Sequence, residues 1–172
     1  GVVKPTKMMS DGRQQIVGLQ FAPDFLGRPF RADSGVTADT ATEVNVCSFP
    51  KTLIDRMIKD TPELEHKLLE QTLKELDEAR DWMLTLGRKT ASEKVASFLY
   101  LIASHIHPEQ ETGASRFELP LSRSDIADFL GLTIETVSRQ MTKLRMDGVI
   151  KISNNRHVEV PDLERLAERA SQ

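Results

Sequence analysis

The 172-residue sequence contains very little cysteine, tryptophan or tyrosine, with one residue of each. A single cysteine excludes an internal disulfide framework, so a reducing cytoplasm is the expected compartment. The sequence has no stretch approaching the roughly 20 consecutive apolar residues of a transmembrane helix, and no signal peptide is visible. We therefore expect a cytoplasmic protein with no membrane partner.

The sequence also offers little from which to build a catalytic site. No nucleophile–base pair is suggested, and no glycine-rich phosphate loop is present. The four histidines are scattered along the chain: His66, His105, His107 and His157. An enzyme is therefore the weakest of the function classes considered.

Charge is distributed unevenly along the chain. The formal net charge is −3, which does not by itself favour a nucleic-acid partner. Between residues 133 and 158, however, five basic residues face two acidic ones, Glu135 and Asp147. The basic residues are Arg139, Lys143, Arg145, Lys151 and Arg156. Such a local excess suits a protein that touches phosphates with one surface only.

This basic region overlaps a helix-turn-helix pattern, residues 122–143. A short helix over residues 125–130 should end at Gly131, where a helix C-terminus tolerates positive φ. Thr133 is a natural N-cap for a second helix. That helix has one apolar stripe, consisting of Ile134, Val137, Met141 and Leu144. Its opposite face carries Glu135, Ser138, Arg139 and Thr142.

The segment that follows distinguishes this pattern from an ordinary helical hairpin with a solvated polar face. Residues 149–152 and 157–160 are predicted to form two strands joined by a turn at residues 153–156. A helix-turn-helix followed by a β-hairpin is the winged-helix arrangement, whose second helix enters the DNA major groove. A last amphipathic helix is expected over residues 163–169.

Short strands punctuated by glycine and proline are predicted at the other end of the chain. They cover residues 2–8 and 15–21, joined by a turn at residues 10–13, and a further strand is centred on residues 43–47. This pattern indicates part of an antiparallel β-roll. Three strands are too few to close a roll, and the sequence begins with Gly1, so we expect an N-terminal portion to be missing.

A long helix should follow, with Thr61 as N-cap and Pro62 in its first turn, running to Gly87. A coiled-coil seam of alternating three- and four-residue spacing runs along it: Leu69, Thr72, Leu76, Ala79, Met83 and Leu86. No charged residue interrupts this seam, which favours a parallel homodimer. Leu73 and Trp82 are expected to pack on the chain itself. A capping box at residues 90–93 opens the next helix.

The predicted fold class is therefore α+β. Residues 1–60 form the C-terminal part of a β-roll sensor domain resembling a cyclic-nucleotide-binding jelly roll, residues 61–87 the dimerisation helix, and residues 88–172 the winged helix-turn-helix DNA-binding domain.

This order of elements resembles the CRP–FNR superfamily of bacterial transcription regulators. Residues 91–99 resemble the family's segment after the dimer helix, and residues 119–127 and 130–139 resemble the FNR branch, including its FixK- and FnrN-like members. The resemblance covers essentially the whole chain. It is specific because residues 135–139, ETVSR, carry the branch's Glu…Ser-Arg reading residues in register.

The resemblance implies that Glu135, Ser138 and Arg139 read bases of a TTGAT…ATCAA-type palindrome in double-stranded DNA, with one half-site per subunit. Glu135 and Arg139 are suited to cytosine and guanine respectively. Contacts to the DNA backbone are expected from Ser122, Arg123, Thr133, Thr136 and Arg156. RNA polymerase is an expected partner, with loops at residues 10–13, 25–33 and 107–115 as candidate contacts.

The sequence says less about the signal to which the sensor domain responds. Arg28 stands where cyclic-nucleotide-binding relatives carry an acid, and no Arg-Ser or Arg-Thr pair follows before Cys47, so no cyclic nucleotide is expected. Cys47 matches the internal ligand of the [4Fe–4S] cluster in oxygen-sensing FNR proteins. One thiolate cannot hold such a cluster, so in this chain we expect no cofactor and a buried core thiol. In the intact protein, Cys47 is predicted to be a cluster ligand.

Two alternatives remain to an activator that responds to low oxygen. One is a FixK-like regulator with no cofactor. The other is a dimeric signalling module that uses its hairpin to bind a protein rather than DNA.

Overall fold

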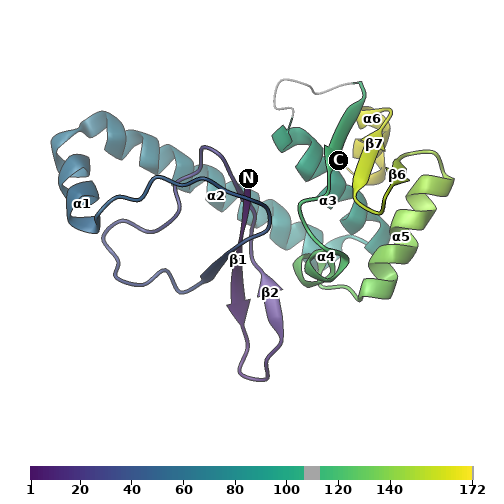
Figure 1. The fold of residues 1–172 in the computed structure, drawn as a ribbon, viewed down its shortest axis with the longest axis horizontal. Coiled ribbons are helices and arrows are strands. Elements are labelled where there is room, and N and C mark those ends of the chain that lie inside the picture. Colours follow the sequence, from purple (N-terminus) through teal and green to yellow (C-terminus); the bar gives the residue numbers. More distant parts are fainter. Residues whose placement is uncertain (107–112, 172) are drawn as a thin grey trace. The chain divides into compact units, whose positions relative to one another are not determined.

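The computed structural model describes residues 1–106 and 113–171. The chain divides into two compact units, Gly1–Trp82 and Met83–Gln172 (Figure 1). The elements in chain order are β1 (Val2–Met8), β2 (Gln14–Ile16), β3 (Gln20–Phe21), β4 (Thr37–Thr40), α1 (Lys51–Asp60), α2 (Pro62–Arg88), α3 (Ala91–Ile106), β5 (Ser115–Glu118), α4 (Arg123–Leu130), α5 (Ile134–Met146), β6 (Lys151–Ser153), β7 (His157–Val160) and α6 (Leu163–Arg169).

The sheet of the first unit is organised around β1. Antiparallel pairing joins β1 to β2 and β3, and also to β4, so that Thr6 lies opposite Ile16 and Val3 opposite Thr40. The predicted turn after β1 is present, with Gly12 at a φ of 87°. A turn follows β3, in which the Asp24 carboxylate accepts a hydrogen bond from the backbone N–H of Phe21 at 2.9 Å. The antiparallel sheet agrees with the predicted roll.

The strand expected at residues 43–47 is absent, and that prediction was wrong. The last strand of the unit is β4, which ends at Thr40. Thr40 pairs with Val3 near the start of β1, so the ladder ends there. Ala41 still donates to the carbonyl of Val2, and Thr42 accepts from the N–H of Val2. Residues 43–47 then have no neighbouring strand among the described residues, and without a partner their alternating pattern cannot form a ladder.

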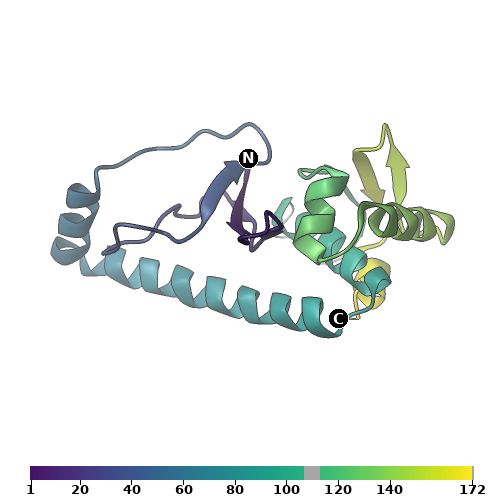
Figure 2. The ribbon, with the colours of Figure 1, turned by 90° about the horizontal axis from the view of Figure 1, so that it is seen from below.

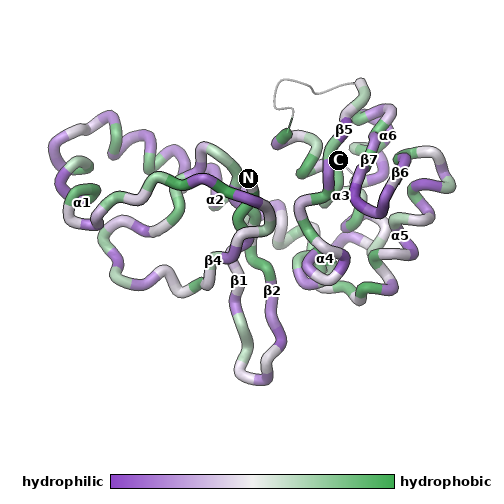
Figure 3. The backbone as a smooth tube through the Cα atoms, in the orientation of Figure 1, coloured by the Kyte–Doolittle hydropathy of each residue, from purple (hydrophilic) through white to green (hydrophobic). Residues whose placement is uncertain are grey.

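The long helix α2 is present, and its 27 residues span about 40 Å at 1.5 Å per residue. Figures 2 and 3 show this helix as one continuous element with apolar residues recurring between polar ones. It ends at Arg88, one residue beyond the predicted end at Gly87. Leu73 was expected to pack on the chain but is 52% exposed. Apolar side chains of α2 such as Leu69, Leu73 and Met83 are therefore left exposed by the described residues.

The core of the second unit lies between α3 and the helix-turn-helix. Helix α3 opens with the predicted capping box, in which the Glu93 carboxylate accepts from the N–H of Thr90 at 2.7 Å. Phe98 is fully buried and meets Phe129 of α4 edge to face, with ring centroids 6.1 Å apart. A three-stranded sheet in the order β5-β7-β6 completes the unit. No helix in the described residues is both long and apolar enough to cross a membrane.

Replacing Phe98 tests whether this core holds the second unit together. Phe98→Ala should lower the free energy of unfolding by about 3–5 kcal/mol, because it removes a buried ring and leaves a cavity. Urea denaturation followed by circular dichroism measures the change. Phe49→Ala is the control, since Phe49 is 54% exposed and its loss should cost within about 0.5 kcal/mol. Equal effects of the two substitutions would contradict this assignment of the core.

Candidate nucleic-acid interface

The helix-turn-helix is fixed by three local signals, of which Gly131 and Thr133 were read correctly from the sequence, whereas α4 begins at Arg123 rather than at residue 125. Ser122 caps α4 by accepting from the N–H of Asp125 at 3.0 Å. Gly131 ends α4 in the left-handed region, at φ 62° and ψ 41°. Thr133 then caps α5 by accepting from the N–H of Thr136 at 3.2 Å. The two helices therefore meet through a turn of fixed length.

Burial determines which face of α5 is presented to solvent. Val137, Met141 and Leu144 are at most 1% exposed and pack against α3 and α4. Ile134 was expected to complete this stripe but is 45% exposed. It is the first residue of α5, and at this terminus it lies beyond the core that covers the rest of the stripe.

The opposite face of α5 presents the predicted base-reading residues together. Glu135, Ser138 and Arg139 are all exposed, and their i, i+3 and i+4 spacing makes them neighbours on the helix surface. Arg139 donates a hydrogen bond to the Thr136 hydroxyl at 3.3 Å, and Thr133 donates to the same hydroxyl at 2.9 Å. The predicted backbone-contact threonines thus lie directly beside the base-reading group.

The basic side chains of the second unit fall into two groups. Arg116 and Lys151 both pair with Glu159, at 3.1 and 2.8 Å. Those contacts, with the hydrogen bond from Lys151 as the first cause, lower the pKa of Glu159. On α5, in contrast, Arg139 and Lys143 form no ion pair with any described residue. Their charges are therefore available to an external anion such as phosphate.

Lys143 was not predicted as a site residue, although it could have been. It follows Arg139 by one helical turn, and both line a shallow depression on α5 together with Ser138, Thr142 and Met146. The i+4 spacing from Arg139 was visible in the sequence.

The wing is a tight hairpin between β6 and β7. Asn154 and Asn155 both have positive φ, 51° and 58°, as the two central residues of a type I′ turn require. The N–H of Arg156 closes this turn by donating to the Ser153 carbonyl at 3.2 Å. Arg123 of α4 donates to the carbonyl of Asn155 at 3.4 Å, so the first helix and the wing tip are joined directly. Burial lowers the pKa of the Arg123 guanidinium.

Arg156, predicted as a phosphate contact, has partners within the unit. Its guanidinium lies 3.6 Å from the Glu118 carboxylate and donates to the carbonyl of Leu119 at 3.5 Å. A phosphate would therefore compete with Glu118 for this side chain. Its proposed role in DNA binding is correspondingly weaker than that of Lys143.

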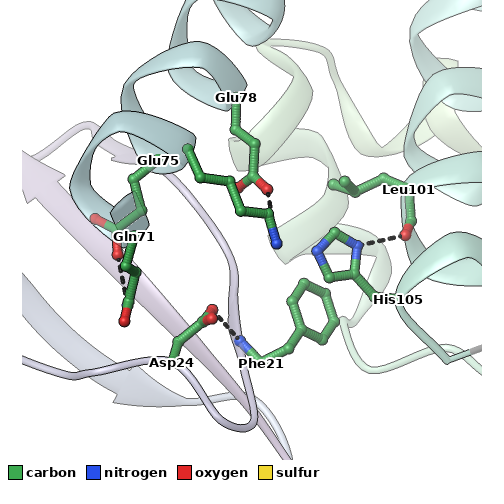
Figure 4. Close-up of polar contacts among 8 residues, drawn as sticks. Phe21, Asp24, Gln71, Glu75, Glu78, Leu101 and His105 are labelled. Carbon is green, nitrogen blue, oxygen red and sulfur yellow. Dashed lines mark hydrogen bonds and ion pairs between the residues drawn. The ribbon is translucent and has the colours of Figure 1, made fainter. Parts of the chain in front are cut away.

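The seam of α2 is largely exposed. Leu69 is 54% exposed, Leu76 44% and Met83 72%. Thr72 and Ala79 are also exposed, and Leu86 is half-buried. Figure 4 shows polar residues beside the seam engaged along the same helix, with Gln71 donating to Glu75 at 3.0 Å. Lys74 pairs with Glu78 in the same way at 3.7 Å. The polar side chains beside the seam thus bind one another along α2. The apolar side chains of the seam itself remain largely exposed.

Cys47 is exposed rather than buried, so the expectation of a core thiol was wrong. It lies in the segment that failed to form a strand, at an open groove lined in part by Val44 and Phe49. A [4Fe–4S] cluster requires four ligands, usually thiolates. Among the described residues, no cluster of three histidine, cysteine or acidic side chains could hold a metal. The residues of this chain alone therefore do not fit an iron–sulfur cluster.

Comparison with known proteins identifies the family. Residues 93–169 match the Crp-like helix-turn-helix domain. A Rhizobium leguminosarum bv. viciae protein named "Probable transcriptional activator" is 64% identical over 96% of this chain and 69% of its own length. The transcriptional activator protein FnrL of Cereibacter sphaeroides is 46% identical over 99% of this chain and 70% of its own. The chain belongs to the CRP–FNR family of transcription regulators, in its FixK/FNR branch.

A solved structure supports the same assignment for this CRP–FNR regulator. FixK2 from Bradyrhizobium japonicum is 33% identical, with a TM-score of 0.81 over 98% of this chain and 82% of that one. The predicted fold class is confirmed, as is the expectation that the protein is a DNA-binding regulator and not an enzyme. Family membership also favours DNA over a protein as the ligand of the helix-turn-helix.

Proposed function

We propose that this regulator binds a TTGAT…ATCAA-like palindrome as a homodimer and activates transcription in the cytoplasm when oxygen is low. The observation that carries the proposal is the exposed group of Glu135, Ser138 and Arg139 on one face of α5. The names of its relatives, which include a transcriptional activator, FnrL, and a nitrogen fixation regulation protein, FixK, agree with this function.

Base recognition follows from the chemistry of the three side chains. The Arg139 guanidinium can donate two hydrogen bonds to O6 and N7 of guanine, and the Glu135 carboxylate can accept from N4 of cytosine. Ser138 has a short hydroxyl that permits close approach of α5 to the base edges. The TTGAT half-site contains one G·C pair, which offers the guanine for Arg139.

Contacts to the DNA backbone would set the position of α5 in the groove. Ser122 and Thr133 are the caps of α4 and α5, and helix N-termini are favourable sites for phosphate. Thr136 and Arg123 lie beside them, and Lys143 adds an unpaired charge one turn beyond Arg139. These contacts supply affinity without sequence information.

A homodimer is supported by the exposed seam of α2. Leucine and methionine side chains repeated on one face of a helix remain costly in water until a second apolar surface covers them. A second copy of the same helix offers the matching seam. Two copies would present two recognition helices to the two halves of a palindrome.

RNA polymerase is the proposed partner in activation. Of the three candidate contact loops, residues 10–13 form an exposed hairpin tip and residues 25–33 form an irregular, largely exposed segment. In the third, 107–115, residues 107–112 lie outside the described residues.

Arg139→Ala should abolish most of the preference for the palindrome. We expect a loss of about 1–3 kcal/mol in binding the palindrome, but a much smaller loss on a scrambled duplex of equal length. Fluorescence anisotropy at several salt concentrations measures both affinities. Arg116→Ala is the control, because it removes the same charge from an exposed arginine of the same unit. Equal losses on the two duplexes would make Arg139 a phosphate contact, and a wild-type protein without preference would refute the palindrome.

Leu76→Glu should weaken the dimer. A charge placed in the apolar seam must be desolvated on association, so we expect the dimer dissociation constant to rise about 100-fold or more. Leu84→Glu is the matched control, since Leu84 is 58% exposed and lies outside the seam. Sedimentation equilibrium measures both variants. If Leu76→Glu raised the dimer dissociation constant no more than Leu84→Glu, the proposal that the dimer forms through the seam would be contradicted.

The cofactor proposal concerns Cys47 in the full-length protein, where three further thiolates would have to come from residues outside this chain. We expect about four iron atoms per protomer after anaerobic purification, and loss of iron in Cys47→Ser. Iron analysis and visible absorption measure this. An iron-free protein, in which Cys47→Ser activates transcription like the wild type, would instead establish the cofactor-free FixK-like alternative.

A further inference from the structure

Two arginines of α6 hold the C-terminal end of the recognition helix α5. Arg165 donates hydrogen bonds to the carbonyl of Asp147 at 2.7 Å and to that of Gly148 at 3.4 Å. Arg169 pairs with the Asp147 carboxylate at 3.1 Å. Asp147 is the C-cap of α5, so two of these contacts are made to the residue that ends the recognition helix and the third to the residue after it.

The hydrogen bond to the Asp147 carbonyl satisfies a group that a helix leaves unsatisfied. The last carbonyls of a helix have no partner within it, and they form the negative end of its dipole. A guanidinium supplies several donors in a fixed plane, together with a positive charge. Arg165 therefore acts as a side-chain cap that comes from another helix, 18 residues along the chain.

The residues that directly follow α6 are anchored to α3 and to the residue before it. Lys89, which directly follows α2, donates to the carbonyl of Ala170 at 2.7 Å and to the Ser97 hydroxyl at 2.8 Å. Ser171 donates to the Glu93 carboxylate at 2.7 Å. Buried side chains of α6 complete its packing against α3: Leu163, Leu166 and Ala170.

We infer that α6 is a positioning element for DNA reading, with Arg165 as its principal positioning residue. The inference rests on the proposed function, because it requires that Arg139 reads a base. Arg139 lies eight residues from Asp147, about 12 Å along the helix axis. A small change in helix direction at Asp147 therefore moves the guanidinium of Arg139 relative to a base edge. Phosphate contacts tolerate such a shift, whereas a bidentate base contact does not.

Direct contact with DNA is the competing role for Arg165. Its guanidinium donates to the carbonyls of Asp147 and Gly148, so a phosphate would have to bind through the remaining N–H groups. The two roles differ in salt dependence, because removing a phosphate contact lowers the slope of log affinity against log salt by about one.

Arg165→Ala separates these roles in the binding assay with palindromic and scrambled duplexes. We expect affinity for the palindrome to fall about three- to tenfold, while affinity for the scrambled duplex and the salt slope are unchanged. Arg165→Lys, which keeps the charge, should recover part of the loss. Arg116→Ala is again the control for charge.

Two results would overturn the inference: an equal loss on both duplexes, with or without a lower salt slope, and no loss on either. Thermal unfolding of each variant is measured in parallel, and Arg165→Lys provides the test if Arg165→Ala does not fold. Arg139→Ala is included in the same series. If it retains full preference for the palindrome, the proposed function fails; if it loses preference while Arg165→Ala does not, only the role of α6 fails.

Discussion

The orientation of α5 depends on the burial of one apolar stripe. Val137, Met141 and Leu144 are removed from water against α3 and α4, and helical geometry then obliges Glu135 and Ser138 to face outward. A rotation of α5 that turned the polar face inward would bury a carboxylate and a guanidinium without partners, which costs several kcal/mol. The same packing that stabilises the second unit therefore presents the residues proposed to read DNA.

Electrostatics add selectivity to this geometry. The chain is acidic as a whole, at −3, yet the exposed cations of α5 have no carboxylate partners among the described residues. Two cations on the sheet of the same unit, Arg116 and Lys151, instead share the carboxylate of Glu159. The cations of the sheet are thus partly neutralised and those of α5 are not, which favours α5 as the surface that attracts DNA.

How much could be predicted from the sequence depended on the range of the interactions. The end of α4 and the start of α5 were predictable because their signals are local: Gly131 tolerates positive φ, and Thr133 caps within three residues. The strand at residues 43–47 was mispredicted because a strand requires a partner that local pattern does not reveal. The burial of Cys47 and the packing of Leu73 were wrong for a related reason, since apolar character does not show what covers a side chain.

The hydrogen bond from Arg165 to the Asp147 carbonyl could not have been predicted from the sequence. It joins residues 18 apart through backbone carbonyls. Every residue type has a backbone carbonyl, so the sequence does not show which one accepts the bond. Arg123 reaches Asn155 in the same manner over 32 residues. Such contacts become visible only when the fold is known.

The central claim is that Arg139 reads a guanine in the half-site, and a cycle that combines protein and base substitutions tests it most directly. Wild type and Arg139→Ala are each titrated with the palindrome and with a duplex in which that G·C pair is replaced by A·T. The account predicts that the base change weakens wild-type binding by about 1–3 kcal/mol but hardly affects Arg139→Ala, because the lost contact is the same one. Additive losses from the two changes would contradict it.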